Sequence, residues 1–525
     1  QEEATSYMGS LVSRQQGVEG RANAVAGMQL VSESISSLSD KRVAEKMTQL
    51  GIEKFNKNEV KELLSFGQNE KDLIEFLNQR KQGGILDLED IEFKDKNALK
   101  QLKEQLGGKS KIYLPGSDVF ENMIGHKVGF TSAVDAFVAH SGPKLSYTHT
   151  PLGDEFFIAS HSLLFERRVL SQTIEVETWE GLPVFFKTQE KGLCPYDIFA
   201  ASFYLLSRYE EAIAHMKNAT GHFDPEESLA SKHHFLERPV VDLWVAHFSS
   251  ILGTYFKEFD FKIKSEPQKE LLIEVPLAFQ YRYRSLLVAL GDFFKSLWEL
   301  NLKALVRQLF VLLRLQPDPF DSFECWNDWF SKSSIRPKVF FLFAKSSAFQ
   351  STISIFNLSF RKRIKQVSDF FPLGVLASVK AQRFPDQQQL AREKNDLQAL
   401  THRVLSSIRL SDSLQELSKE YSAFINAEFV SDYSMGYKDR LGYRAGTATP
   451  FFFYDISNEF QLPLKVHPIF ASEEALRKMN EVTAFEKMKV YSNALPLASG
   501  KFTLVLTNGF LHPSLKNNTF QKWKS

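Results

Sequence analysis

Short apolar runs alternate with long helical segments along the second half of the chain, and this alternation constrains the fold more than any other feature. The apolar runs are typical of buried strands and fall at 271–275, 339–343, 373–379 and 502–506, with helical spacing at 285–314, 387–406 and 412–427. Such alternation builds a parallel sheet or barrel, because each helix returns the chain to the start of the next strand. We therefore expect an α/β architecture from about residue 269 to residue 525.

Residues 1–108 differ in texture from the rest. They hold no convincing strand pattern, and their apolar residues recur at helical spacing, as in Val43, Met47 and Leu50. The pair Gly107 and Gly108 is typical of a linker. The sequence therefore predicts a helical N-terminal region that ends at residue 108.

The middle of the chain mixes both kinds of segment. Residues 173–186 are typical of a hairpin that turns at Glu180 and Gly181, and a helix is expected from about Tyr196 to Ala214. The predicted organisation is a helical region, a mixed α/β domain and a final α/β domain, at 1–108, 109–268 and 269–525.

Positive and negative charges nearly cancel, with 64 Lys and Arg residues against 63 Asp and Glu residues. The whole chain therefore has no strong field to draw it to nucleic acid or to an anionic membrane. The most apolar stretch, 285–315, carries a charged residue every three or four positions, which predicts one or two amphipathic helices and no membrane span. The short basic run at 360–363 is expected to lie on a solvated helix face.

Two long runs of residues carry a family resemblance. The first covers 197–211 and 221–242 and begins Asp-Ile-Phe-Ala-Ala-Ser-Phe-Tyr; the second covers 432–451 and begins Asp-Tyr-Ser-Met-Gly-Tyr. The first resembles the N-terminal domain that precedes a polysaccharide deacetylase barrel in a family common among Bacteroidetes, and the second resembles that family's barrel. The resemblance covers roughly residues 111–525. It implies a distorted (β/α) barrel, with its site at the carboxyl ends of the strands, preceded by a mixed α/β domain.

The family's enzymes remove acetyl groups from sugars with a divalent metal ion held by one Asp and two His, which polarises the acetyl carbonyl and activates water. A second Asp acts as general base and a late His as general acid. The resemblance places Glu274 on the base and Pro276 on the metal-binding Asp. It places Leu376 and Ser411 on the two metal-binding His residues, and Thr507 on the general acid.

Four of these positions, Pro276, Leu376, Ser411 and Thr507, hold side chains that cannot perform the family's role. Proline and leucine offer no ligand, and an unactivated hydroxyl does not donate a proton near neutral pH as imidazolium does. The other histidines lack partners at metal-ligand spacing, so we expect no metal and no other cofactor. The resemblance therefore implies a catalytically degenerate member.

Three further positions are candidates for ligand binding: Arg444, Asp432 and His467. Arg444 is either structural, tied to Asp432 or to a backbone carbonyl, or it faces a sugar or an anionic ligand. A charged set in the middle region could likewise hold a polar ligand, but we expect it to be an ion-pair network that braces the middle domain against the barrel. That set comprises Arg208, Glu210, Glu211, Arg238 and Asp242. Trp326, Trp329 and Tyr454 could stack on sugars, but aromatic residues at this density are expected in the core.

These patterns favour a non-catalytic binding or scaffold protein in a bacterial envelope or glycan-related assembly. The helical region would recruit a protein partner, and the barrel would offer a docking surface for it or for a glycan. The alternative is a working deacetylase, metal-dependent or with a shifted site that uses Glu274, His467 and Arg444. The chain begins at Gln1, which is compatible with a removed secretory signal and so with a periplasmic or envelope location; a cytoplasmic location is the alternative.

Overall fold

The computed structural model describes residues 118–511, except for 127, 167–168, 191, 214–216, 219–220, 259–260, 262–267, 332, 334, 348, 384–386 and 498, together with three short strands nearer the N-terminus. These strands, β1 (Ser32–Ser34), β2 (Ile52–Asn56) and β3 (Glu92–Phe93), form an antiparallel sheet. The prediction of no strands in residues 1–108 was therefore wrong. Ile52 and Phe55 stand three residues apart, a spacing that suits a helix, so this strand gives no sequence signal. The helices expected in this region lie outside the described residues.

The middle domain is built around two buried helices, α8 (Ile198–Leu206) and α11 (Val240–Tyr255). All nine side chains of α8 are buried. The helix starts at Asp197, whose carboxylate accepts hydrogen bonds from the backbone N–H of Phe199 and Ala200 at 3.0 and 2.9 Å and so caps the first turn. The shorter elements around them are η3 (Asp118–Ile124), α7 (Val134–Ala139), β4 (Leu145–Thr148), β5 (Phe156–Ala159), η4 (Ser162–Phe165), β6 (Glu177–Trp179), β7 (Leu182–Val184), α9 (Tyr209–Ala212), η5 (Pro225–Glu227) and α10 (Leu229–Lys232).

The predicted hairpin is confirmed, with shorter strands than expected. Strands β6 and β7 pair in antiparallel fashion, and Glu180 and Gly181 both take positive φ, at 50° and 76°. Two such residues make the tight turn whose twist matches that of paired strands. The single helix expected from Tyr196 to Ala214 is instead two helices, α8 and α9. It breaks at Arg208, which takes a left-handed φ of 54°.

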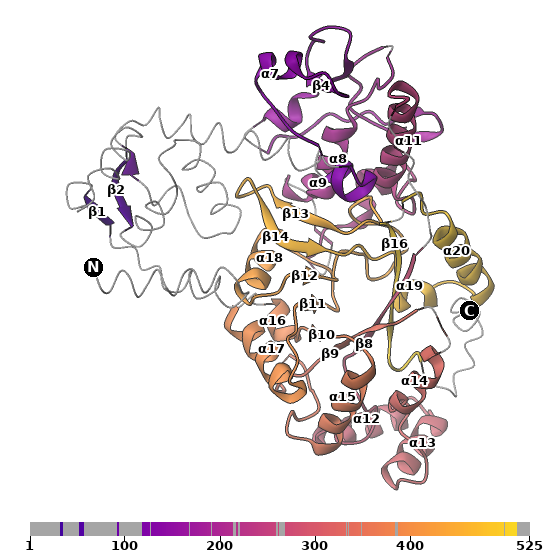
Figure 1. The fold of residues 1–525 in the computed structure, drawn as a ribbon. Helices are drawn as coiled ribbons and strands as arrows, with labels where there is room; N and C mark the ends of the chain where they lie inside the picture. The colour runs from indigo at the N-terminus through magenta and orange to yellow at the C-terminus, as the bar shows by residue number, and fades with distance from the viewer. Residues whose placement is uncertain are drawn as a thin grey trace.

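A large sheet of nine strands dominates the rest of the molecule, and all of its pairings are parallel except that of β13 with β14 (Figure 1). The expected α/β architecture is thus confirmed as a mostly parallel sheet with helices. In spatial order the strands are β13 (Phe451–Asp455), β14 (Phe460–Val466), β12 (Ser431–Asp432), β11 (Ser407–Arg409), β10 (Leu373–Leu376), β9 (Lys338–Phe341), β8 (Gln268–Val275), β16 (Lys501–Thr507) and β15 (Ala471–Ser472).

The connections between these strands are mainly helical. The stretch 285–314 forms a pair of helices, one of the two forms expected, whereas the helices expected at 387–406 and 412–427 are shorter than predicted. The helices of this part are α12 (Leu286–Trp298), α13 (Leu302–Leu312), α14 (Phe323–Ser331), α15 (Leu358–Phe370), α16 (Val379–Arg383), α17 (Gln387–Thr401), α18 (Leu417–Asn426), α19 (Glu473–Arg477) and α20 (Glu481–Asn493). In the described residues no helix is both long enough and apolar enough to cross a membrane.

The large sheet curls strongly, as the link between β14 and β15 requires. Only residues 467–470 join Val466 to Ala471, and five Cα-to-Cα steps reach at most about 19 Å. Measured along the sheet, the same two strands are seven spacings apart, or about 34 Å. The link also bonds to both sides, because Ile469 N–H donates to Met435 O at 2.9 Å, just beyond β12, and Phe470 N–H donates to Thr503 O of β16 at 3.0 Å.

The concave face of the sheet is filled by a cluster of side chains that we call the central cluster. It draws one or two residues from each of several strands and from the loops that follow them: Leu272, Phe340, Leu342, Ala344, Leu376, Tyr433, Ile469 and Val505. Neighbouring strand residues such as Ile273, Val375 and Leu504 belong to a larger cluster, as expected when side chains alternate between the two faces. Both faces of these strands are therefore buried, which explains their continuous apolar runs.

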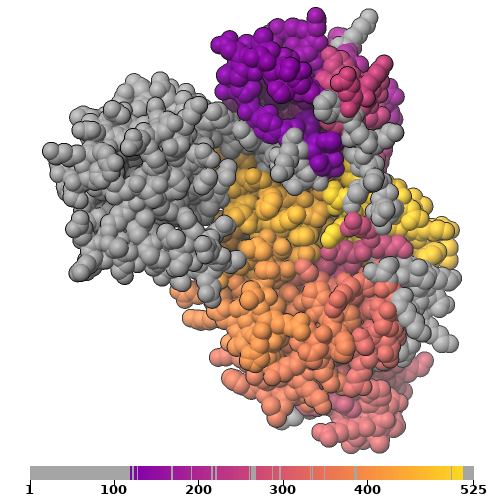
Figure 2. All heavy atoms as spheres, viewed as in Figure 1, coloured from indigo at the N-terminus to yellow at the C-terminus, as the bar shows by residue number. Residues whose placement is uncertain are grey.

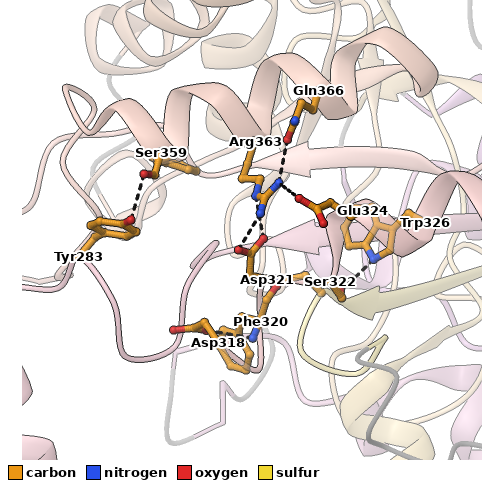
Figure 3. A network of polar contacts seen from close by, with 12 residues as sticks. Tyr283, Asp318, Phe320, Asp321, Ser322, Glu324, Trp326, Ser359, Arg363 and Gln366 are labelled. Carbon is orange, nitrogen blue, oxygen red and sulfur yellow. Dashed lines mark hydrogen bonds and ion pairs between the residues drawn. The ribbon is translucent and has the colours of Figure 1, made fainter. Parts of the chain in front are cut away.

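The basic run at 360–363 lies on helix α15 as predicted, but it is not simply solvated. Phe360 is buried, and Arg363 is half-buried against two acidic residues (Figure 3). Its guanidinium donates to Asp321 Oδ2 at 3.0 Å and to Glu324 Oε1 at 2.6 Å. This pairing fixes α15 to the start of α14.

Candidate functional site

The carboxyl ends of the parallel strands meet at one rim of the curled sheet, and the positions singled out from the sequence lie there. In α/β sheets, function resides at this end because the loops that follow the strands converge on it. Glu274 stands near the end of β8, Leu376 ends β10, and Thr507 ends β16. Pro276 and Ser411 follow β8 and β11 by one and two residues.

Glu274 does not stand free as a base. Its Oε1 accepts a hydrogen bond from Nε of Arg409, and both side chains are buried. The same guanidinium donates through Nη1 to the carbonyl of Tyr433. The carboxylate is therefore engaged in a buried ion pair and is not directed at open space. Pro276 beside it presents no ligand atom.

Leu376 lies in apolar surroundings. It is 1% exposed and belongs to the central cluster with Phe340 and Tyr433. The neighbouring Gly374 makes room for Phe340, since an added Cβ would stand 2.4 Å from that ring. The position that would hold one of the two metal-binding histidines is therefore part of the packed interior.

Ser411 lines a small pocket at the rim that is partly open to solvent and has a cavity volume of about 10 Å³. Hydroxyl groups dominate its wall, from Ser411, Ser413, Ser434 and Ser472. This volume has room for about one water molecule. The pocket is thus smaller than a sugar chain requires.

Thr507 is held by a residue that the sequence did not single out. Its hydroxyl and its backbone N–H both donate to Glu473 Oε2, at 2.6 and 2.9 Å. The next residue, Asn508, is fully buried and donates through its amide to the carbonyls of Leu277 and Phe320, both at 3.0 Å. The Thr507 bonds tie the end of β16 to helix α19, and the Asn508 bonds tie it to the loop after β8 and to the segment before α14. Both residues therefore have a structural role.

Asp432 and His467 face opposite sides of the sheet. The Asp432 carboxylate lies on the helix-covered side, where the hydroxyl of Tyr421 in α18 donates to Oδ2 at 3.1 Å. Its burial raises the pKa to about 6. The ring of His467 instead stacks on Tyr433 of the central cluster, with ring centroids 4.1 Å apart. The two candidates therefore do not form one ligand site.

His467 is neutral at physiological pH. Burial lowers its pKa to about 2, with further lowering by the positive charges of Lys338, Lys501 and Lys465. Lys338 lies on the same inner side and donates to the Tyr433 hydroxyl at 2.6 Å. A histidine that stays unprotonated cannot serve as a general acid near pH 7.

Arg444 points to the middle domain. Its Nε and Nη2 donate to the two oxygens of Glu211 at 2.9 and 2.6 Å, and Nη2 also donates to the carbonyl of Leu414 at 3.0 Å. Arg208 binds the same carboxylate at 2.8 Å and also Glu210 at 2.8 Å. Of the two interpretations left open for Arg444, this geometry matches the structural one. The guanidinium binds a backbone carbonyl, as that interpretation allowed, and its carboxylate partner is Glu211 and not Asp432.

The rest of the predicted charged set behaves differently. Asp242 does not pair with an arginine but accepts hydrogen bonds from the hydroxyls of Thr447 and Thr449, both at 2.6 Å. Arg238 is directed at the carbonyl of Gly181. The brace between the domains therefore combines an ion-pair network with a buried carboxylate that binds hydroxyls.

The aromatic candidates for sugar stacking are core residues. Trp326 is fully buried and donates from its indole N–H to the Ser322 hydroxyl at 3.0 Å. Tyr454 is 1% exposed and packs edge-on against Phe203 of the middle domain. Trp329 is partly buried against the large core.

The rim residues do not fit the metal ion that the family's chemistry needs. Leu376 is enclosed by carbon atoms, and Glu274 is neutralised by Arg409. Within the described part of the chain, no three His, Cys, Asp or Glu side chains gather closely enough to hold an ion.

Sequence reasoning missed Arg409, Glu473 and Lys338, which organise the rim and the interior. Lys338 begins a strand and Arg409 ends one, and a charged residue inside a strand otherwise flanked by apolar residues is a usable signal for an internal pair. Glu473 gives no such signal, because it lies in the first turn of a short helix, where acidic residues are common.

Comparison with known proteins gives a single family match. Residues 112–257 match a family described as a family of unknown function (DUF7033). The matched range lies within the middle domain. No curated protein matches the chain.

Glu420 is a buried residue of helix α18. We expect it to make the free energy of unfolding fall as pH rises. Burial raises its pKa from 4.5 to about 7, although the backbone N–H groups of Gln415 and Glu416 donate to it. The folded state therefore binds the proton more tightly than the unfolded state. The stabilisation from this proton is complete below pH 4.5 and is lost as pH rises through about 7.

Replacing Glu420 with glutamine keeps an acceptor oxygen and removes the ionisation. We expect Glu420→Gln to be more stable than the native chain by about 2–3 kcal/mol at pH 8 and nearly equal to it at pH 4. Urea unfolding at the two pH values measures this. A difference that does not change with pH would show that Glu420 does not titrate as described.

Proposed function

We propose that this chain is a catalytically degenerate member of the Bacteroidetes-type polysaccharide deacetylase family, with a distorted (β/α) barrel, and that it acts as a non-catalytic binding or scaffold component of a bacterial envelope or glycan-related assembly. One observation carries the proposal. The rim where the family's metal ion would lie is filled by Leu376 in the central cluster and by the buried pair of Glu274 and Arg409.

The shape of the large sheet supports the barrel. The sheet curls so far that residues 467–470 link strands near its two ends, and the central cluster fills the concave side. A small barrel is closed in this way, with side chains that fill its interior. The match of residues 112–257 to a family of its own agrees with a separate domain in front of that barrel.

The competing function, a hydrolase with a shifted site, has little support from the geometry. It requires Glu274, His467 and Arg444 to act together on one substrate. Each of the three has a different partner: Arg409, Tyr433 and Glu211, respectively. An imidazole with a pKa of about 2 is also unsuited to proton transfer near neutral pH.

The proposed role places recruitment of a protein partner in residues 1–108 and, at the barrel, a docking surface for that partner or for a glycan. It also places the protein in the periplasm or at the cell envelope.

Deletion of residues 1–108 tests the recruiting role. The tagged full-length and shortened chains would be purified from the native host, and the co-purified proteins quantified by mass spectrometry. We expect the shortened chain to keep the circular dichroism and thermal unfolding of its two folded domains and to lose its specific partners by about tenfold or more. A folded, shortened chain that retains every partner would refute the role of residues 1–108.

A further inference from the structure

The helices α12 and α13 form a hairpin that is inserted between strands β8 and β9. It lies at the end of the molecule farthest from the middle domain, where residues near 300 form a lobe at the lower end of the surface (Figures 1 and 2). The helices have 13 and 11 residues, hence lengths of about 20 and 17 Å. Neither the proposed function nor the rim makes use of this hairpin.

Each helix of the hairpin presents an apolar stripe to solvent. The stripe on α12 has the spacing i, i+3, i+4, i+7, and that on α13 has the spacing i, i+4, i+7, i+11, so each follows one face of its helix. The exposed stripe residues are Leu290, Phe293, Phe294 and Leu297 on α12, Leu302, Val306 and Leu309 on α13, and Leu313 at the C-cap of α13. Trp298, the last residue of α12, is 90% exposed, and Leu300 in the turn is 82% exposed.

The hairpin is held firmly to the protein by its other side. Gln308 and Val311 of α13 are buried, and the Gln308 side chain donates to the carbonyl of Ala289 in α12 at 3.1 Å. Arg282 donates to the carbonyls of Val311 and Gln316 at 3.1 and 3.0 Å. The stripes therefore face outward because the opposite side is already used.

The base of the hairpin is fixed by a buried carboxylate. Asp318, drawn beside Phe320 in Figure 3, accepts hydrogen bonds from the backbone N–H groups of residues 280, 281 and 282 at 2.6, 2.9 and 3.1 Å. It joins the segment that enters the hairpin to the segment that leaves it. The apolar face is thus presented by a rigid support.

Positive charge accompanies the apolar stripe. Lys303 and Arg307 lie one turn apart on α13 and are exposed, and Arg314 is exposed just after the helix. With about 100° per residue, all three fall on the flank between the stripe and the buried side. Residues 285–315 carry four Lys or Arg residues and two Asp or Glu residues, so the hairpin is basic although the whole chain is nearly neutral.

We propose that the α12–α13 hairpin docks in the plane of an anionic lipid bilayer. The apolar stripes enter the boundary between headgroups and acyl chains, Trp298 lies at this boundary, and Lys303, Arg307 and Arg314 contact anionic headgroups. In-plane helices combine an apolar face with flanking Lys and Arg in this way, and tryptophan is enriched at the same depth. Helices of 20 and 17 Å are too short to cross a hydrocarbon core of about 30 Å.

The composition of the stripes favours lipid over a protein partner. Leucine provides most of the exposed surface, and the eight stripe side chains carry no hydrogen-bonding group. A fluid acyl boundary needs no directional contact, so it suits a leucine-rich surface.

Co-sedimentation of the full chain with vesicles tests the proposal. The vesicles would contain phosphatidylcholine with or without about 30% of the anionic lipid phosphatidylglycerol. We expect binding to the anionic vesicles that weakens with salt, and a blue shift of tryptophan emission that Trp298→Phe abolishes. The double variant Leu302→Ser, Leu309→Ser should bind the anionic vesicles at least about tenfold more weakly than the native chain.

The matched control is Leu358→Ser with Val404→Ser, since these two side chains are 82% and 87% exposed but lie outside the hairpin. This control should bind vesicles as the native chain does, and circular dichroism should show that both double variants fold. Native protein that ignores anionic vesicles, or equal binding by both double variants, would overturn the proposal. It would also be overturned if, without vesicle binding, sedimentation equilibrium showed a dimer that the stripe variant alone dissociates, because a second copy would then cover the stripes.

Discussion

Replacing Glu211 with glutamine is expected to lower the free energy of unfolding by about 3–5 kcal/mol, because it removes the one negative charge shared by two buried guanidinium groups. Glu211 binds Arg444 at 2.6 Å and Arg208 at 2.8 Å, and the side chains of all three are at most 6% exposed. Burial alone would raise the pKa of Glu211, but the attraction of Arg444 and Arg208 outweighs it and lowers the pKa to about 2.

The pH dependence of this effect has a definite sign. A carboxylate whose folded pKa is below its ordinary 4.5 stabilises the protein above that pH, and the stabilisation is lost as pH falls through about 2. Urea unfolding at pH 7 and at about pH 2.5 should therefore show a large difference between Glu211→Gln and the native chain at the higher pH and a smaller one at the lower.

The control is Glu226→Gln, which also removes a pair between the two domains. Glu226 binds Arg440 at 2.7 Å, but its side chain is 68% exposed. Exposed pairs contribute about 0–1 kcal/mol, so this variant should remain close to the native chain. If Glu211→Gln were no more destabilising than the control, the buried network would not be what holds the domains together.

Replacing Gly442 with alanine should cost about 2–4 kcal/mol, the second largest effect that we expect. Gly442 has a φ of +130°, which side-chain-bearing residues rarely adopt, and an added Cβ would stand 2.6 Å from the carbonyl oxygen of Leu236 in the middle domain. That oxygen also accepts the N–H of Tyr443 at 2.9 Å, so it cannot move without loss of a bond.

The variant Gly181→Ala separates the cost of backbone strain from the cost of the close contact. Gly181 has a φ of +76°, but nothing lies within 4 Å of its added Cβ. The loss there should be limited to backbone strain, about 1 kcal/mol. Thermal unfolding monitored by circular dichroism compares the two variants. Equal losses would mean that close approach of the domains at Gly442 does not limit the side chain there.

The strands that the sequence predicted are those with continuous apolar runs. Strands β8 and β16 lie next to each other within the sheet and are buried on both faces. Their residues Leu271–Ile273 and Leu504–Leu506 are therefore recognisable as apolar runs in the sequence. Strands β11 and β12 have three and two residues and carry no periodic signal. Strand β14 contains Pro463, which argues against a strand when only the sequence is known.

The candidate site was predictable in position but not in its partners. The family resemblance placed Glu274, Leu376 and Thr507 at the ends of strands, and the structure has them there. Their contacts depend on residues far away in the chain: Arg409 is 135 residues from Glu274, and Arg444 is 233 residues from Glu211. A single sequence does not reveal such pairs, so Asp432 and His467 were grouped although they lie on opposite sides of the sheet.

We propose that the chain lacks deacetylase activity, and an acetate-release assay tests this most directly. The purified full chain would be incubated with zinc, cobalt or nickel and with acetylated oligosaccharides of the chitin and peptidoglycan types, and free acetate would be measured over hours. The proposal predicts release no faster than in protein-free controls, because Leu376 and the Glu274–Arg409 pair occupy the rim. Metal-dependent release at an enzyme-like rate of about 1 s⁻¹ or more, abolished in Glu274→Gln, would contradict it.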